Sequence, residues 1–412
     1  MKKLFLLAWP IALAAVSCSN EEVVSVNNDA NEITFAVVAN NSTRALNDSM
    51  YCNNYKPGSF HVWALAKDNS VATVVGKSYF KEVLYSANTG KTLWSADQAN
   101  IRFWPNQGAE KLDFYVMHNY NGTVQWTPGE ADTNKARLAV EGYTLTTDVA
   151  AQTDFIYAVK QNQVKEGNDG KKTINFRHAL SQVVFKARNT NSTLHVEIGE
   201  VQVKNFNSKG NFALPLKDTE TTLVDHNSNQ TTEAADGTVG TWSSQNTLAT
   251  TSVAVYNTTV EGQAEATYAA VNYDTAGTNA TNLTNGSDRL FDKAMLFIPQ
   301  ERTAGTVTES TPGSKNLFND GTNPYFVVKC KIWNVEGAAF NKGTDVCIYD
   351  GYAYIPVTVD WKPGKKYIYT FVFGGKNGGY DEDGNDILVP ISFDVTVDDF
   401  TPVVKEDVNM FQ

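Results

Sequence analysis

The sequence has little of what the common enzyme classes need. Its 412 residues include only four cysteines, too few for a scaffold built on disulfides. Only five histidines occur, and no two lie four residues apart, which excludes the helical zinc motif. The nucleophile motif G-x-S-x-G is also absent. These absences predict a protein that is not an enzyme and needs no metal or cofactor.

Positive charge is also scarce. The chain has 34 Lys and Arg against 45 Asp and Glu, a formal net charge of −11. An acidic surface repels phosphate backbones, so we expect no nucleic-acid partner. With 42% apolar and only 19% charged residues, the composition excludes a disordered acidic chain, a collagen and a coiled coil.

Long apolar runs are missing beyond the amino terminus, so no membrane-spanning helix is expected there. Lys2 and Lys3 precede a 13-residue apolar stretch, residues 4–16, which is too short to cross a bilayer of about 30 Å and is typical of a signal peptide. The stretch ends in Ala15-Val16-Ser17-Cys18, which resembles the lipobox of bacterial lipoproteins. It predicts cleavage before Cys18 and a lipid on that cysteine. The alternative is an ordinary secretory signal with an incidental cysteine.

The residues after Cys18 indicate where the chain is sent. Ser19-Asn20-Glu21-Glu22 resembles the acidic signal that exports lipoproteins of Bacteroidetes to the cell surface. We therefore expect a surface-exposed lipoprotein of the outer membrane, attached to the membrane only through its lipid.

The body of the chain has the pattern of β-strands throughout. Short alternating or β-branched runs, bounded by Gly, Asn, Asp and Pro, recur at 33–38, 60–65, 112–117, 325–333 and 391–397. The 18 Tyr and 21 Phe suit half-buried pleated surfaces, and long amphipathic helical patterns are nearly absent. The predicted fold class is all-β, built from antiparallel β-sandwiches.

Two polar stretches interrupt this pattern. Residues 160–172 predict either a hairpin tip or a link between domains. Residues 217–288, rich in Thr, Asn, Ser and Asp, are interpreted as a long loop region and not as a separate domain. No repeat of fixed period occurs, which argues against a solenoid or a propeller.

Two motifs that resemble ligand sites fail on their spacing. Gly90-Lys91-Thr92 resembles the end of a phosphate-binding loop, but Tyr85 stands where that loop needs a glycine. Residues 381–386 are rich in acids, as a calcium loop is, but that loop needs Gly at its sixth position, and Gly384 is the fourth. Both motifs are interpreted as turns.

Cys330 and Cys347 both lie in strand-like runs, 17 positions apart. In an oxidising envelope they could form a disulfide across a hairpin. Two buried free thiols are the alternative.

Several segments, taken in order, form a more specific pattern. The most distinctive is Phe176-Arg177-His178-Ala179-Leu180-Ser181, and the others lie at 33–35, 43–45, 100–105, 112–117, 152–156, 295–300, 361–367 and 391–400. Together they resemble the fimbrillin family, the pilus subunits of Bacteroidetes, over nearly the whole chain. The resemblance makes His178 a family signature residue on a strand and not a catalytic one.

The resemblance implies two transthyretin-like β-sandwich domains in tandem and a specific mode of assembly. A trypsin-like protease cuts after an arginine near the amino terminus, the first strand leaves, and a strand from a neighbouring subunit takes its place. In this sequence the cut would fall between Arg44 and Ala45, in a polar stretch that we expect to be an exposed loop. It would also remove the lipid on Cys18.

The residues themselves support this exchange. The strand to be displaced carries Ile33, Phe35 and Val37, and a strand near the carboxyl terminus carries Ile391, Phe393, Val395 and Val397. Both place Ile, Phe and Val at alternate positions, so both present the same apolar face. Coincidence is the alternative, because I-x-F-x-V is a common strand pattern.

These observations give one predicted organisation and function. The expected segments are a signal peptide at 1–17, a propeptide at 18–44, sandwich domains at 45–172 and 173–390, and a donor strand with its tail at 391–412. The expected function is a structural subunit of a surface fimbria that supports cell adhesion, with other fimbrial subunits, the protease and a host or bacterial surface ligand as partners. The alternative is a monomeric surface lipoprotein that binds glycans through some of its eight Trp. A glycosidase ranks third.

Overall fold

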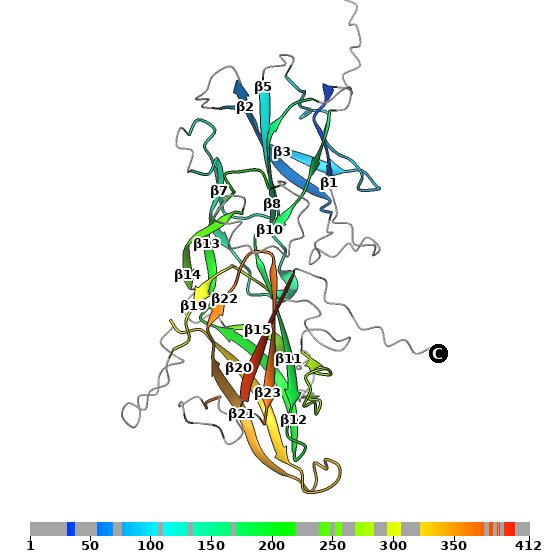
Figure 1. Cartoon of the computed structure of the whole chain (residues 1–412), viewed down its shortest axis with the longest axis vertical. Coiled ribbons are helices and arrows are strands. Elements are labelled where there is room, and N and C mark those ends of the chain that lie inside the picture. Colours follow the sequence, from blue (N-terminus) through cyan, green and yellow to red (C-terminus); the bar gives the residue numbers. More distant parts are fainter. Residues whose placement is uncertain are drawn as a thin grey trace, which may run out of the picture.

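Strands form nearly all of the regular structure, as the alternating pattern predicts. The structure is a computed structural model that describes residues 31–37, 56–68, 76–105, 110–130, 135–165, 170–219, 239–247, 252–257, 268–283, 295–305, 322–374, 379–381, 385, 387 and 391–399. In these residues the named elements are strands and a single-turn 3-10 helix, Val149–Ala151 (η2). The molecule is elongated, with an amino-terminal part and a carboxy-terminal part placed end to end (Figure 1).

The amino-terminal part is built on an eight-stranded sheet. Its strand order is β10 (Arg177–His178), β8 (Ile156–Gln163), β5 (Glu110–His118), β2 (Ser59–Asp68), β3 (Lys77–Ala87), β4 (Trp94–Ala96), β1 (Thr34–Val37) and β9 (Lys171–Ile174). A four-stranded sheet packs against it, with the order β14 (Thr241–Thr247), β13 (Asn207–Ala213), β7 (Leu138–Thr144) and β6 (Thr123–Trp126).

Both faces of the central strands of this eight-stranded sheet are covered. One core gathers Phe35, Phe60 and Phe114, and a second core on the opposite face gathers Trp63, Tyr115 and Phe212. As a result every residue from Leu112 to Met117 in β5 is buried, including Asp113. The alternation expected of a strand with one solvated face is therefore absent there.

The carboxy-terminal part has two further sheets around one core. One has the order β17 (Thr281–Asn282), β11 (Ser181–Asn189), β23 (Lys365–Phe373) and β24 (Ile391–Asp399), with β18 (Met295–Phe297) also on β11. The other has the order β15 (Ser252–Asn257), β12 (Leu194–Lys204), β20 (Tyr325–Asn334) and β21 (Val346–Pro356), with β16 (Ala269–Ala270) also on β12. A two-stranded sheet joins β19 (Glu301–Arg302) to β22 (Val359–Asp360). The shared core includes Phe185, Phe326 and Phe371.

The all-β prediction is confirmed, and the predicted antiparallel pairing holds for all but two pairs of the described strands. β1 runs parallel to β9, and β11 runs parallel to β23 over eight residue pairs, from Gln182–Lys366 to Asn189–Phe373. These partners are far apart in the sequence, so the chain can bring them together in the same direction, as a hairpin cannot.

The chain passes between the two parts more than once. β13, which follows the expected boundary at 172/173, pairs with β7, which precedes it. The region 217–288, interpreted as loop, contributes four strands in its described portions, β14 to β17. They lie at or near sheet edges, on β13, β12 and β11.

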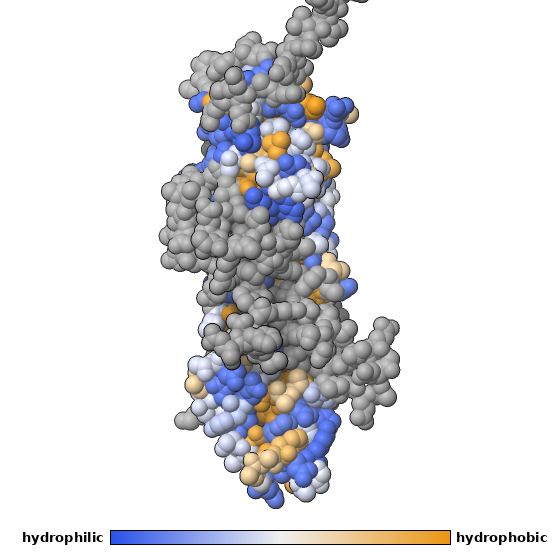
Figure 2. Space-filling model, turned by 90° about the vertical axis from the view of Figure 1, so that its right-hand side faces the viewer, coloured by the Kyte–Doolittle hydropathy of each residue, from blue (hydrophilic) through white to orange (hydrophobic). Residues whose placement is uncertain are grey.

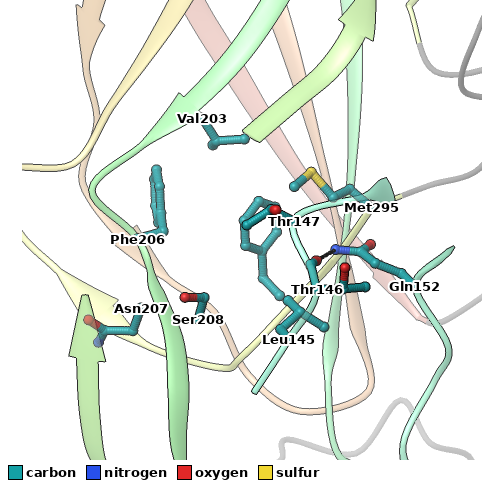
Figure 3. Close-up of a pocket in the computed structure, with 10 residues that line it drawn as sticks. Leu145, Thr146, Thr147, Gln152, Val203, Phe206, Asn207, Ser208 and Met295 are labelled. Carbon is teal, nitrogen blue, oxygen red and sulfur yellow. Dashed lines mark hydrogen bonds between the residues drawn. The ribbon is translucent and has the colours of Figure 1, made fainter. Parts of the chain in front are cut away.

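The two parts meet at a junction that we call the waist, and the strand β18 contributes side chains to the cores on both sides of it. In β18, Met295 and Phe297 enter the carboxy-terminal core, while Leu296 and the following Ile298 enter the amino-terminal one. The buried Gln152 holds this strand like a neighbouring strand would: its Oε1 accepts from Leu296 N at 2.8 Å and its Nε2 donates to Leu296 O at 3.2 Å. Figure 3 shows the small cavity beside Gln152 and Met295, which has room for about one water molecule and is too small for an organic ligand.

The visible face in Figure 2 shows the same elongated outline. Its described surface is mostly hydrophilic, with small apolar areas over each part that hydrophilic residues separate. The described exposed apolar side chains include Tyr79, Leu84, Val346, Tyr352 and Val395. Scattered apolar residues of this kind are normal on a soluble surface.

His118, at the end of β5, makes the stability of the amino-terminal part depend on pH. Burial lowers the pKa of its imidazole from the ordinary 6.5 to about 4, opposed by a backbone hydrogen bond with Ser59. As pH falls from about 6.5 to about 4, the unfolded chain takes up a proton that the folded chain does not. We expect a loss of up to about 3 kcal/mol of unfolding free energy over this window.

Replacing His118 by Gln should remove this dependence. Urea unfolding at several pH values between 7 and 4, followed by Trp fluorescence, would measure it. An unchanged slope of unfolding free energy against pH in His118→Gln would contradict the assignment.

Candidate functional site: the first strand and the carboxy-terminal strand

The first strand, β1, lies between two strands of the eight-stranded sheet. Residues 34–37 pair with residues 171–174 of β9, and Phe35 pairs with Trp94 of β4. The three inward side chains predicted from the alternation are buried: Ile33 and Phe35 are 0% exposed and Val37 is 5% exposed. β1 is therefore an integral part of the core and has neighbours on both edges.

Phe35 lies in a cage of aromatic rings. Its centroid is 4.8 Å from that of Tyr85, 5.2 Å from that of Phe114 and 5.9 Å from that of Phe60, each in edge-to-face geometry. Such pairs contribute about 0.5–1.5 kcal/mol each beyond their buried area. The cage therefore fits an aromatic ring at the position of Phe35, whichever strand takes the place of β1. We call β4, β9 and this cage the β1 seat.

The segment just before β1 is held by backbone contacts. Ile33 N donates to Arg102 O at 2.7 Å, and Trp104 N donates to Asn31 O at 2.8 Å. Gly170, just before β9, approaches so closely that a Cβ there would lie 1.9 Å from Glu32 O. Only glycine leaves room for this backbone, so Gly170 sets how closely a strand can be seated.

The predicted donor strand, β24, lies at the edge of a sheet on its own subunit. It pairs antiparallel with β23 from Lys365–Asp399 to Phe373–Ile391. Its apolar residues are buried unequally: Ile391 is 0% exposed, Phe393 is half-buried, and Val395 is 42% exposed. The backbone of Val397 pairs with Tyr367, and its side chain lies outside the described set. β24 thus has the same alternation of apolar residues as β1, but its apolar side chains are less buried.

Other predicted site residues are not placed. Cys18, Arg44 and Ala45 lie outside the described residues. The lipid and the cleavage site therefore stay predictions.

Cys330 and Cys347 are both free thiols in the structure. They lie on neighbouring strands, but Cys330 pairs with Gly351 while Cys347 pairs with Trp333, so the register sets them apart along the hairpin. The predicted hairpin is therefore present without a disulfide. The alternative of two buried thiols fits only Cys330, since Cys347 is exposed.

His178, which the resemblance predicts to be a family signature residue, has a partner that sequence reasoning missed. His178 Nδ1 hydrogen-bonds to a carboxylate oxygen of Asp154, which is fully buried. Burial raises the pKa of the Asp154 carboxyl, and His178 acts in the opposite direction. Asp154 lies in the segment 152–156 and His178 in the segment 176–181, and both segments belong to the family-like pattern. The occurrence of both segments in one chain was the only sequence signal that could have indicated this pair.

The run that contains His178 joins the two parts at the waist. Ala179 N donates to Phe155 O at 2.8 Å in the amino-terminal part, and Ser181 Oγ donates to Lys362 O at 2.8 Å in the carboxy-terminal part. Together with the hydrogen bond between His178 and Asp154, these contacts give the run a structural role. Among the described residues, no group of three or more His, Cys, Asp or Glu is placed to hold a metal ion. In the same residues no helix is long and apolar enough to cross a membrane.

Comparison with known proteins gives the chain a family. Among solved structures, a candidate cell adhesion protein from Bacteroides uniformis is similar to it, with 13% identity, a TM-score of 0.42, and coverage of 90% of this chain and 99% of the other. A candidate cell adhesion protein from Parabacteroides distasonis has 10% identity and a TM-score of 0.43, with 90% and 99% coverage. A candidate polysaccharide-binding protein from Bacteroides thetaiotaomicron has 11% identity and a TM-score of 0.34, with 88% and 96% coverage.

No curated protein matches the chain. The family profile described as fimbrillin-like matches residues 43–399, which is most of the sequence. The chain therefore belongs to the fimbrillin-like family.

Proposed function

We propose that this protein is a structural subunit of a cell-surface fimbria that supports adhesion, and that it polymerises by strand exchange. Proteolysis after Arg44 removes β1, and β24 of a second copy enters the β1 seat. The observation that carries the proposal is the contrast between two strands with one pattern: β1 is buried between two neighbours, whereas β24 is a partly exposed edge strand.

The energetics favour exchange only after cleavage. Burying Ile33, Phe35 and Val37 contributes about 5–9 kcal/mol gross, so an intact β1 keeps the seat occupied. Once β1 is gone, Val395 of an incoming strand would be buried as deeply as Val37, and its backbone would gain a second neighbouring strand. The loss of pairing with β23 opposes this gain. The protease therefore controls when assembly begins.

The same proposal includes the path of the subunit to its fibre. The lipid on Cys18 holds the exported chain at the outer membrane, and cleavage after Arg44 severs it from the body that polymerises. The amino-terminal and carboxy-terminal parts would correspond to two transthyretin-like domains in tandem. The range 43–399 matched by the family includes nearly all of the proposed processed body.

The glycan-binding alternative depended on exposed tryptophans, and those in the described residues are mostly internal. Trp63, Trp94, Trp104, Trp333 and Trp361 are buried. Trp126 and Trp242 are partly buried, and each donates its indole N–H to a protein oxygen, Ser78 Oγ and Ala179 O respectively. Sugar-stacking platforms would need open ring faces, so we favour the fimbrial function.

Limited trypsin digestion of the purified mature chain tests the proposal. We expect one early cut after Arg44, seen by mass spectrometry, followed by a ladder of oligomers in size-exclusion chromatography. The Arg44→Gln chain should stay uncut at this position and monomeric under the same conditions. A cut at Arg44 that leaves a stable monomer would refute strand exchange.

A further inference from the structure

The segments that hold β1 form a basic surround. The backbone of residues 31–37 pairs with or hydrogen-bonds to the segments 94–96, 101–105 and 170–174, and the side chain of Asn31 accepts a hydrogen bond from Lys165. These contacting segments carry four cations, Arg102, Lys165, Lys171 and Lys172, and contain no Asp or Glu. Lys171 is exposed, while Lys172 is only 4% exposed, with its ammonium 5.6 Å from the centroid of the Trp104 ring.

The net charge of this surround is positive, whereas that of the chain as a whole is negative. The whole sequence has a net charge of −11; without the two lysines of residues 1–17 and the net −3 of residues 18–44, residues 45–412 carry −10. Two such bodies repel each other over distances comparable to the Debye length, about 8–10 Å at physiological ionic strength. A joint between two copies therefore needs a local attraction.

Both segments proposed to occupy the β1 seat are acidic. Residues 18–44 contain four acids and one Arg, a net charge of −3. Residues 391–412 contain one Lys against five acids, a net charge of −4, and the acids are Asp394, Asp398, Asp399, Glu406 and Asp407. The departing and the incoming segment are thus both opposite in charge to the basic surround.

The register places one of these acids beside one of the cations. If Ile391, Phe393 and Val395 take the positions of Ile33, Phe35 and Val37, Asp394 takes the position of Ala36. Ala36 pairs with Thr173, and Thr34 on the same face pairs with Lys171. Asp394 would therefore project on the outer face within reach of the long Lys171 side chain.

We infer that the β1 seat selects an acidic strand from a second copy of this chain, with Lys171 of the accepting subunit paired to Asp394 of the incoming strand. This inference rests on the proposed strand exchange and adds its electrostatic specificity. The cations speed the encounter and fix the register, while the apolar face supplies the affinity.

A charge-exchange experiment on the full processed chain tests the pair. Lys171→Glu and Asp394→Lys are each expected to slow polymerisation about three- to tenfold at low salt, because attraction is replaced by repulsion. The double variant restores an opposite-charge pair at every joint and should recover to within about twofold of the unaltered chain. At about 1 M salt the four proteins should converge, since screening then acts within about 3 Å.

Lys217→Glu and Glu336→Lys are matched controls, because they make the same charge changes at exposed positions elsewhere. Single variants that behave like these controls, or a double variant as slow as the two single effects combined, would overturn the charge pairing while leaving strand exchange intact. An unaltered processed chain that forms no polymer would overturn strand exchange and this inference with it.

Discussion

Replacing Val395 by Asp is expected to abolish polymerisation of the processed chain while leaving the folded monomer almost unchanged. On its own subunit Val395 is 42% exposed, so a carboxylate there remains hydrated and should change the unfolding free energy by no more than about 0.5 kcal/mol. In the β1 seat the same position would be buried like Val37. An unpaired carboxylate buried there costs several kcal/mol, which corresponds to a loss of more than about 100-fold in assembly.

The neighbouring residue supplies the control. Thr396 is exposed on the opposite face of β24, so Thr396→Asp adds the same charge to the same strand without directing it into the seat. Assembly measured by light scattering, together with urea unfolding of each monomer, separates the two effects. Equal assembly by the two variants would show that β24 does not enter the seat in the proposed register.

Replacing Phe35 by Ala is expected to have the largest effect on the uncut chain. Phe35 is fully buried among Phe60, Tyr85 and Phe114, so truncation should lower the unfolding free energy of the amino-terminal part by about 3–5 kcal/mol. Chemical denaturation of the uncut chain measures this loss. Thr34→Ala, on the same strand but half-buried on the other face, should cost less than about 1 kcal/mol.

The same variant has a second readout. Because cleavage removes residue 35, processed Phe35→Ala chains should polymerise at the normal rate. A change below 1 kcal/mol in the uncut chain would mean that the aromatic cage does not retain β1.

The sequence predicted which residues of the site form strands, but it did not predict which strands these pair with. The alternation in Ile33–Phe35–Val37 is a local signal, and it correctly identified which side chains face the core. One of the two partners of β1 is β9, more than a hundred residues away, and no local pattern encodes a parallel pairing over that distance. The exposure of Val395 was equally unpredictable, because it depends on β24 lying at an edge.

The sequence also did not predict that both faces of β5 are buried. Asp113 sits in the middle of a buried strand, where it forms an ion pair with Lys67 of the adjacent β2. Charged side chains are rarely buried without a partner, and the packing of the four-stranded sheet on that side is what buries this one. The pairing of His178 with Asp154 was likewise missed, although both residues lie in segments that had been singled out.

In the proposed fibre, the strand β18 would have a mechanical consequence. Its successive side chains anchor in different cores, so bending the subunit at its waist would pull Met295 and Phe297, or Leu296 and Ile298, out of well-packed surroundings. Each subunit should therefore respond to tension and bending as a stiff rod. The compliance of a filament made from such rods would be concentrated at its joints, and its persistence length would be set by the seated strand and not by the body that carries it.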